Sequence, residues 1–328
     1  MKLLLLKQDG RQYDATAACT SISWRGTAAE AARSLSFSYI NAPYDITRTL
    51  PTIATGDAVS FSCEPEGEVF FGQIFGIEKS SQTGSITYEA FDLMKHLLES
   101  KGQYVFKKTT PEAIAAQVLA DVQVPVRYLY PTGVNIESML CDSMSLYDII
   151  LAAYGKAKAA TGDRYFAMIY KRGFGMYRAE WSVKNFVLSD RINIYESSAS
   201  EHMDEIKNQI KIYDQSGTQV GELKDESSIK MFGVFQDIYR QEGDGDSSAG
   251  AKELLKGMPE ASLQLSALGD ISCLSNYFVQ IQDSATGISG KYWIASDEHV
   301  FEGGTHKMRL EVKFDSVMDV KESGHELD

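Results

Sequence analysis

The sequence predicts an α+β fold that is mainly antiparallel β, with two small β-barrel-like domains and a mixed α/β insert. Short apolar or alternating runs, separated by turns rich in glycine, proline and asparagine, fill both ends of the chain. Helical spacing of apolar residues appears between them. The 328 residues suffice for two or three compact domains. We therefore expect a β-barrel domain at 1–92, an α+β insert at 93–185, and a second β-barrel-like domain at 186–328.

Strands dominate the first ninety residues. The opening run KLLLLK is too short for a signal-peptide core and is followed at once by polar residues, so it predicts a first strand. The runs that follow are SISW, SLSFSYI, AVSFSC, VFFGQIFGIEK and SITYEAF. In the last of these, Ile86, Tyr88 and Ala90 face one way. Gly72 and Gly76 indicate a bend in its partner strand, as at a barrel corner.

The period then changes to that of helices. The first predicted helix ends near residues 101–102, and its apolar residues are Phe91, Met94, Leu97 and Leu98. In the second, Thr110 is an expected N-cap and Pro111 suits the first helical position. Its expected buried stripe is Ile114, Val118, Leu119 and Val122.

The remaining elements complete the α+β pattern. A third helix begins after the expected cap Ser145, and a hairpin turns around KRGFG. A second hairpin pairs NQIKIYD with TQVGELK, and the run IKMFGVFQDIYR continues this strand-rich region. An acidic glycine-rich loop at 242–250, expected to be mobile until assembly, leads into a short helix. An antiparallel set closes the chain, and its tail KESGHELD is expected to fray.

Composition and charge exclude several classes of protein. The net charge of −13 opposes nucleic-acid binding, which needs clustered cations. No apolar run is long enough to span a membrane, so we expect the chain to be made and kept in a cytoplasm or assembled there. The thiols lack the spacing of zinc sites and are expected to be buried and free, at Cys19, Cys63, Cys141 and Cys273.

Two histidines form the strongest candidate metal site. His299 and His306 flank the turn in DEHVFEGGTHK, so a hairpin could bring them together, with Asp297 and Glu298 adjacent. The spacing matches no metalloenzyme motif, and exposed polar residues are the simpler expectation. A metal site and an exposed polar hairpin both stay open at this point.

Other candidate sites are weaker. Asp244 and Asp246 resemble the start of a calcium loop, but Leu255 stands where the closing carboxylate belongs. The acidic pairs Asp204/Glu205 and Glu64/Glu66 are expected on the solvated surface. The tryptophans, which could bind sugars, are expected to pack in cores: Trp24, Trp181 and Trp293. No catalytic, cofactor-binding or metal residue is assigned, and we expect a protein that works through its surfaces.

The order of several short motifs carries a resemblance to a known family. These motifs are Gly56–Asp57, Phe70–Ile74, Phe91–Asp92, Leu97–Leu98, Tyr104–Phe106 and Thr110. In this order they resemble the baseplate hub family of contractile phage tails and Gram-positive prophages, related to the late control protein D group. The segment around Asn208 and the closing strands extend the resemblance over nearly the whole chain. Residues 256–259 and 275–276 depart from the family pattern, which affects details of the last domain.

The resemblance implies a structural protein rather than an enzyme. It implies a homotrimeric ring in which two similar domains per subunit present quasi-sixfold symmetry to a hexameric tail tube. The expected partners are the tube protein, a spike protein and other baseplate proteins, with no cofactor. The expected location is the virion tail baseplate, assembled in a bacterial cytoplasm. The acidic balance would suit a channel wall along which DNA slides without sticking.

Two other functions stay open at this point. A tail-associated protein could degrade the cell wall, although no paired-carboxylate or Cys–His arrangement is evident. It could instead bind carbohydrate through exposed aromatic side chains. An infective phage, a defective prophage and a bacteriocin particle are equally compatible with the sequence.

Overall fold

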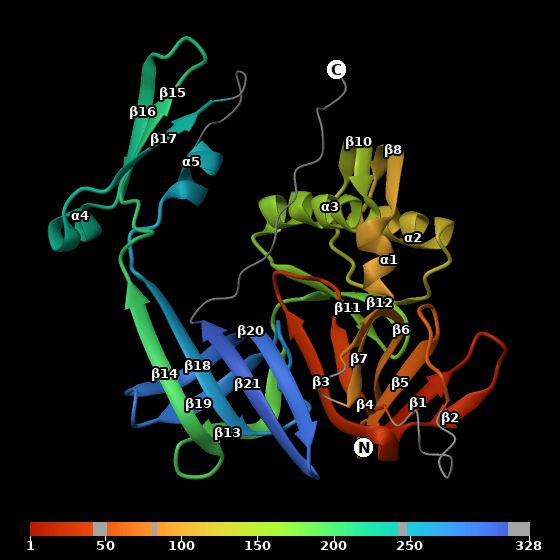
Figure 1. Cartoon of the computed structure of the whole chain (residues 1–328). Coiled ribbons are helices and arrows are strands. Elements are labelled where there is room, and N and C mark those ends of the chain that lie inside the picture. The colour runs from red at the N-terminus through yellow and green to blue at the C-terminus, as the bar shows by residue number, and fades with distance from the viewer. Residues whose placement is uncertain (42–50, 81–83, 242–247, 314–328) are drawn as a thin grey trace. The chain divides into compact units, whose positions relative to one another are not determined.

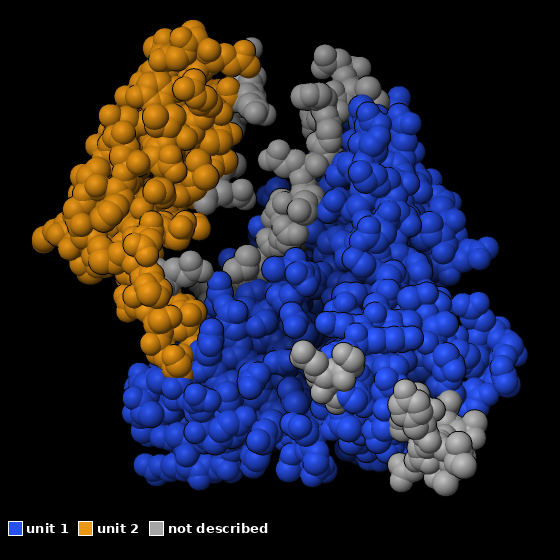
Figure 2. Space-filling model, in the orientation of Figure 1, with its two compact units in different colours: residues 1–197, 264–328 blue, residues 198–263 orange. Residues whose placement is uncertain are grey.

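The computed structural model describes residues 1–41, 51–80, 84–241 and 248–313. It divides into two compact units (Figure 2): residues 1–197 with 264–328, and residues 198–263. The predicted fold class is confirmed, because antiparallel strands predominate and short helices are interspersed among them (Figure 1). No helix of the described residues is both long and apolar enough to cross a membrane.

The N-terminal part of unit 1 is an antiparallel set of seven strands. Their pairing order is β3-β4-β7-β6-β5-β1-β2 (Figure 1). Their bounds are β1 Lys2–Leu6, β2 Gln12–Asp14, β3 Cys19–Thr27, β4 Ser34–Ile40, β5 Ala58–Cys63, β6 Gly67–Lys79 and β7 Ser85–Asp92. A single 3-10 turn, Thr16–Ala18, separates β2 from β3. The first strand and the hairpin β6–β7 are where the sequence predicted them.

Alternation along these strands builds the N-terminal core. Phe37 and Tyr88 are buried on paired strands, and their rings stack with centroids 5.2 Å apart. The register of β6 against β7 shifts between Ile74 and Gly76, which places a bulge where the glycines predicted a bend. A Cβ on Gly72 would lie 2.2 Å from a backbone oxygen of β7, so only glycine fits there.

Three helices and five strands follow. They are α1 Met94–Glu99, β8 Lys101–Thr109, α2 Pro111–Asp121, β9 Val126–Leu129, β10 Ile136–Ser145, α3 Leu146–Thr161, β11 Tyr165–Tyr170 and β12 Gly173–Arg178. Strand β8 pairs with β10, and β12 lies between β11 and the parallel strand β9. The helices share one core with these strands, in which Ile114, Ile149 and Tyr154 are fully buried.

The predicted helix caps are confirmed. The Thr110 hydroxyl accepts the Ala113 N–H at 3.4 Å, and the Ser145 hydroxyl accepts the Asp148 N–H at 3.0 Å. The burial predicted for Val122 is wrong. This residue follows the last helical residue, where the backbone has turned to φ −112°, and its side chain is 39% exposed.

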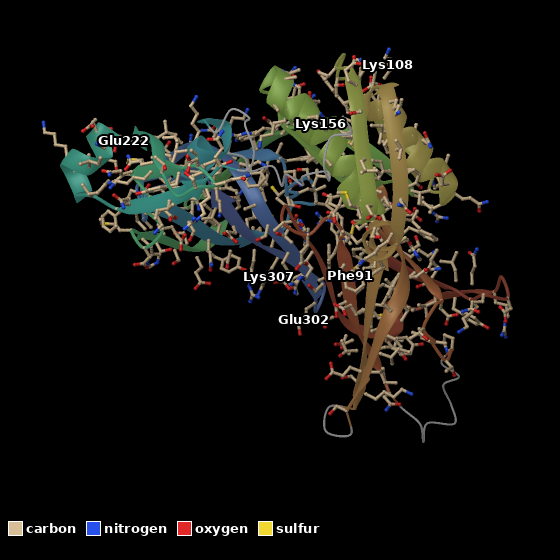
Figure 3. The ribbon with its side chains drawn as sticks, turned by 90° about the horizontal axis from the view of Figure 1, so that it is seen from above. Phe91, Lys108, Lys156, Glu222, Glu302 and Lys307 are labelled. Atoms are coloured by element: carbon tan, nitrogen blue, oxygen red, sulfur yellow. The ribbon has the colours of Figure 1, made fainter. Side chains whose placement is uncertain are left out.

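The C-terminal strands join the N-terminal set. They are β13 Ser182–Ser189, β14 Ile194–His202, β18 Glu260–Leu268, β19 Phe278–Asp283, β20 Ile288–Glu302 and β21 Thr305–Lys313. The long strand β20 pairs with β21 on one edge and with β3 on the other, and Glu302 and Lys307 lie near the β20–β21 turn (Figure 3). All thirteen strands thus form one sheet, in which eleven follow a pairing path from β14 to β2 while β19 pairs with β20 off this path and β13 pairs with β19. The pairings among described residues form an open path, not closed rings.

Unit 2 is a small α+β module. It contains β15 Gln209–Tyr213, β16 Gln219–Lys224, α4 Glu226–Phe232, β17 Gln236–Arg240 and α5 Ser248–Leu254. The hairpin β15–β16 is confirmed, with Gly217 at φ +85° in its turn. The run IKMFGVFQDIYR was expected to be extended, and this prediction is wrong for residues 229–232, which belong to α4. The Asp225 carboxylate accepts the Ser228 N–H at 3.0 Å and starts a helix there, which ends at Gly233. Residues 242–247 of the acidic loop and the tail from 314 lie outside the described residues.

Candidate functional site

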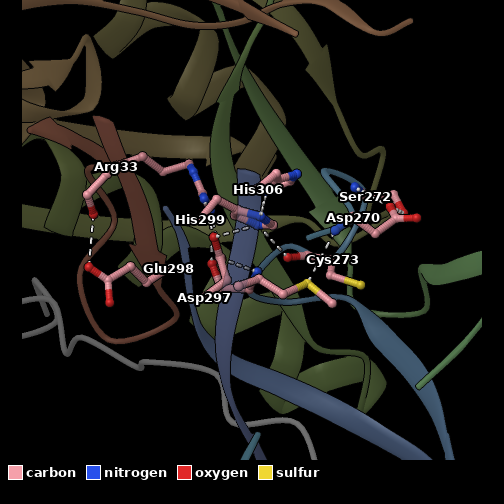
Figure 4. Close-up of polar contacts among 11 residues, drawn as sticks. Arg33, Asp270, Ser272, Cys273, Asp297, Glu298, His299 and His306 are labelled. Carbon is pink, nitrogen blue, oxygen red and sulfur yellow. Dashed lines mark hydrogen bonds and ion pairs between the residues drawn. The ribbon is translucent and has the colours of Figure 1, made fainter. Parts of the chain in front are cut away.

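A buried polar cluster in unit 1 surrounds Arg33, immediately before β4 (Figure 4). Its guanidinium donates to both carboxylate oxygens of Asp297 on β20, with Nη1 at 3.0 Å from Oδ1. It also donates to the Ser275 hydroxyl at 3.3 Å and lies 4.2 Å from the Trp24 ring centroid. The lack of a side chain at Gly26 leaves space for the Arg33 guanidinium, because a Cβ at Gly26 would lie 2.2 Å from Nη1. We call Arg33, Asp297, Ser275 and Asp92 the polar joint.

Asp297 also fixes the loop that precedes β19. Its Oδ1 accepts the Ser275 backbone N–H at 2.6 Å, in addition to the bond from Arg33. The carboxylate is buried and has both a cation and a backbone donor, which is the condition for a charge to be stable away from water. The loop, β20 and the start of β4 are therefore held at one point.

The backbone of Arg33 connects the joint to the first helix. Its N–H donates to Asp92 Oδ2 at 3.3 Å, while Asp92 Oδ1 accepts the N–H of Met94, the first residue of α1, at 3.0 Å. Complete burial raises the pKa of the Asp92 carboxyl to about 7, against the opposing effect of these two backbone bonds. The polar joint thus spans the end of β7, the start of β4 and the middle of β20.

The two predicted histidines lie together beside this cluster. The Nε2 of His299 is 3.1 Å from the Cys273 carbonyl oxygen, which can only accept, so His299 carries its proton on Nε2. Its Nδ1 then accepts from His306 Nε2 at 3.1 Å. Burial lowers the pKa of both rings, that of His306 to about 4, so both are neutral near pH 7. The predicted proximity across the hairpin is confirmed.

The geometry gives this pair a structural role. Both ring nitrogens of His299 make hydrogen bonds, and the nearby Asp297 is bound to Arg33. Strand alternation turns Glu298 away, where it accepts from the Ser23 hydroxyl at 2.9 Å. No group of three or more His, Cys, Asp or Glu side chains suited to a metal ion occurs among the described residues.

The other predicted site residues are scattered. Asp244 and Asp246 lie outside the described residues, and Leu255 packs against the small core of unit 2. The acidic pairs at 64/66 and 204/205 are exposed, as predicted. The four thiols are free; three are buried and Cys19 is partly buried, with burial raising its pKa to about 12.

Two tryptophans pack in cores as predicted, and one does not. Trp24 and Trp293 are each 2% exposed. Trp181 is 40% exposed, because only part of its ring is covered, by Tyr177 at a centroid distance of 4.6 Å and by Tyr277 at 5.4 Å. The expectation of core packing for Trp181 is therefore wrong.

A protein-family model described as YqbQ-like matches residues 22–313. The chain belongs to the YqbQ-like family. It is 27% identical over 302 residues to the uncharacterized protein YqbQ of Bacillus subtilis (strain 168), covering 89% of this chain and 91% of that protein. It is 26% identical over the same length, with the same coverage, to the phage-like element PBSX protein XkdQ of that organism.

Solved structures share the fold of this YqbQ-like chain. The 43 kDa tail protein of prophage MuSo2 from Shewanella oneidensis has a TM-score of 0.75 at 13% identity, covering 95% of this chain and 98% of that one. A tail protein from Neisseria meningitidis MC58 has a TM-score of 0.69 at 12% identity, covering 96% of both chains. The Escherichia coli c3393 protein has a TM-score of 0.54 at 11% identity, covering 94% of this chain and 76% of that one.

The sequence reasoning missed Arg33, the central residue of the polar joint in this YqbQ-like chain. A signal was present, because Arg33 is a lone charge between two alanines and the run SLSFSYI, which forms the largely buried strand β4. Its partners lie about 60 and 264 positions away in the sequence, so no local pattern could identify them.

Proposed function

We propose that the chain is a structural subunit of a phage or phage-like tail, and specifically the baseplate hub that joins tail tube to spike. The full-length likeness to the MuSo2 tail protein carries this proposal, because it spans 95% of this chain and 98% of that one. A relative belonging to the phage-like element PBSX supports it. So does the c3393 protein, described as a type VI secretion component similar to the T4 tail proteins gp27 and gp5.

The hub is a homotrimer with three sequence segments, 1–92, 93–185 and 186–328, in each subunit. It contacts the tube protein, the spike protein and other baseplate proteins, and it is located at the tail baseplate after assembly in the host cytoplasm. The polar joint supports such a role, because it fastens distant segments of the chain with buried, charge-assisted bonds. A part that transmits force between tube and spike needs that kind of connection. Its channel wall is acidic, in keeping with the net charge of −13.

Tail particles provide the direct test. Particles induced from a bacterium that encodes the chain are purified, and an antibody against the chain is used to label them for electron microscopy. Labelling at the baseplate end, with three copies per particle by quantitative mass spectrometry, is the expected result. Label along the whole tube, or particles without the chain, would contradict the hub assignment.

One observation favours carbohydrate binding as a second candidate. Tyr128 is 43% exposed and stacks on Tyr177, which also contacts the exposed ring of Trp181. Exposed aromatic faces of this kind bind sugar rings. Binding of wild type but not of Trp181→Ala to purified peptidoglycan glycans would support this candidate, and equal binding would remove it. Cleavage of peptidoglycan by the purified chain would instead support the cell-wall-degrading alternative.

A further inference from the structure

The three-stranded sheet of unit 2 has two chemically different faces. Ile210 and Ile212 of the central strand β15 point to one face, where they pack with Ala251 of α5. Helix α5 lies beside this sheet (Figure 1). Lys211, between them, points to the other face. By strand register it lies beside Glu222 of β16 and Ile238 of β17. We call this second side, with Lys224 and Arg240, the open face.

The open face is positively charged in an acidic protein. Among the described residues of this sheet it carries Lys211, Lys224 and Arg240 against one carboxylate, Glu222, whose Oε1 is already bound by Lys224 Nζ at 2.8 Å. Neither Lys211 nor Arg240 has an ion pair within the part of the chain that the structure describes. The chain as a whole has a net charge of −13. The open face therefore attracts negatively charged surfaces, and the chain as a whole is negatively charged.

Apolar groups accompany this charge and are held in place. Ile238 on the open face is 47% exposed, and the α4–β17 turn at one end of the sheet exposes 59% of Val234. The turn is rigid, because the fully buried Asn208 amide donates to the Gly233 carbonyl at 2.7 Å and accepts the Phe235 N–H at 2.7 Å. Exposed apolar side chains held by a buried polar anchor are typical of protein interfaces.

We propose that the open face of unit 2 binds an acidic surface on a second copy of this chain. The inference rests on the proposed homotrimer and names one of its contacts. Charge complementarity selects the occupant, since the second copy is acidic. A basic face that meets a different, acidic patch makes a head-to-tail contact, and contacts of this kind close into rings when the rotation is suitable. A ring of three is therefore compatible with this pairing.

Reversal of one charge tests the contact. The Arg240→Glu variant of the full-length chain is compared with Lys252→Glu, which makes the same charge change on an exposed lysine of α5, the helix that covers the other face. Self-association is measured by sedimentation equilibrium over a range of protein concentrations. We expect wild type to oligomerise, Arg240→Glu to raise the dissociation constant about tenfold or more, and Lys252→Glu to match wild type. Raising NaCl from about 50 mM to about 500 mM is expected to weaken wild-type association.

Three results would overturn the inference. These are a wild type that stays monomeric at every concentration, an Arg240→Glu variant that associates like wild type, and equal weakening by both substitutions. Circular dichroism of each variant establishes that a change in association is not a loss of folding. Failure here is distinguishable from failure of the hub proposal, because labelling of tail particles at the baseplate does not depend on which face joins the subunits.

Discussion

Replacement of Asp297 by asparagine tests how much the polar joint contributes to the free energy of unfolding. The substitution keeps the shape of the side chain but removes its charge and puts an amide donor where Arg33 also donates. Arg33 is only 7% exposed, so its charge is left without a partner away from water. Breaking a buried ion pair in this way lowers the free energy of unfolding by about 3 to 5 kcal/mol.

Urea unfolding followed by tryptophan fluorescence measures this loss. One of the three tryptophans, Trp24, has its ring 4.2 Å from the guanidinium carbon of Arg33, so part of the signal comes from beside the joint. With an m-value of about 3 kcal/mol/M, the Asp297→Asn midpoint is expected about 1 to 1.7 M below that of wild type.

Two further variants serve as comparisons for Asp297→Asn. Glu68→Gln removes a half-exposed ion pair with Arg172 and is expected to cost about 1 kcal/mol or less. The double variant Arg33→Met/Asp297→Leu removes both buried charges and is expected to recover part of the lost stability, because the buried Ser275 N–H still loses its acceptor. An Asp297→Asn protein as stable as Glu68→Gln would refute the view that a buried ion pair fastens these strands.

The histidine pair, the Asn208 anchor and the glycines of β6 each give a further prediction. The pKa of His306 is about 4 when folded and near 6.5 when unfolded, so the unfolded state takes up the proton first as pH falls. The contribution of His306 to stability is therefore lost between pH 6.5 and 4, so the urea midpoint of wild type should fall relative to that of His306→Gln over this range. The pKa of Asp92 is raised to about 7, so the folded state takes up that proton first and gains stability as pH falls. Both proteins keep Asp92, so the difference between their urea midpoints reports on His306. Asn208→Ala leaves the buried Ser228 hydroxyl and the partly buried Gly233 carbonyl and Phe235 N–H without their Asn208 partner, and it should cost about 1 to 3 kcal/mol. Hydrogen exchange should quicken at 209–213 while unit 1 is unchanged, and equal protection would contradict this prediction. Gly72→Ala forces a Cβ to 2.2 Å from a backbone oxygen of β7 and should lower Tm strongly; Gly76→Ala, with its nearest atom at 3.4 Å, should lower Tm much less.

The parts of the fold set by neighbouring residues could be predicted from the sequence. The caps Thr110 and Ser145 act on N–H groups three residues away, so their chemistry is visible in the local pattern. The KRGFG hairpin was also predicted, although its two-residue turn is made by Lys171 and Arg172, both at positive φ, where asparagine and glycine are the usual residues. The histidine pair was also predictable, since one tight turn brings its two strands together.

The rest depended on contacts between distant residues. The pairing of β3 with β20, and the bond from Arg33 to Asp297 across 264 positions, leave no trace in a local pattern. Helix α4 was missed because its run of apolar residues also suits a strand, and its one clear signal is the cap Asp225. Partial exposure of Trp181 reflects how far Tyr177 and Tyr277 happen to cover its ring, which composition does not specify.

The pairing of β3 with β20 also affects how the chain is synthesised. Ser23 and Glu298, which bond across these two strands, are 275 residues apart. At the usual pace of bacterial ribosomes, roughly 14 to 55 s pass between the emergence of one strand and that of the other. During this time the nascent chain exposes an unpaired strand edge beside many sister chains on the same messenger. Slower initiation of translation should therefore raise the yield of soluble protein more than a lower temperature after synthesis does.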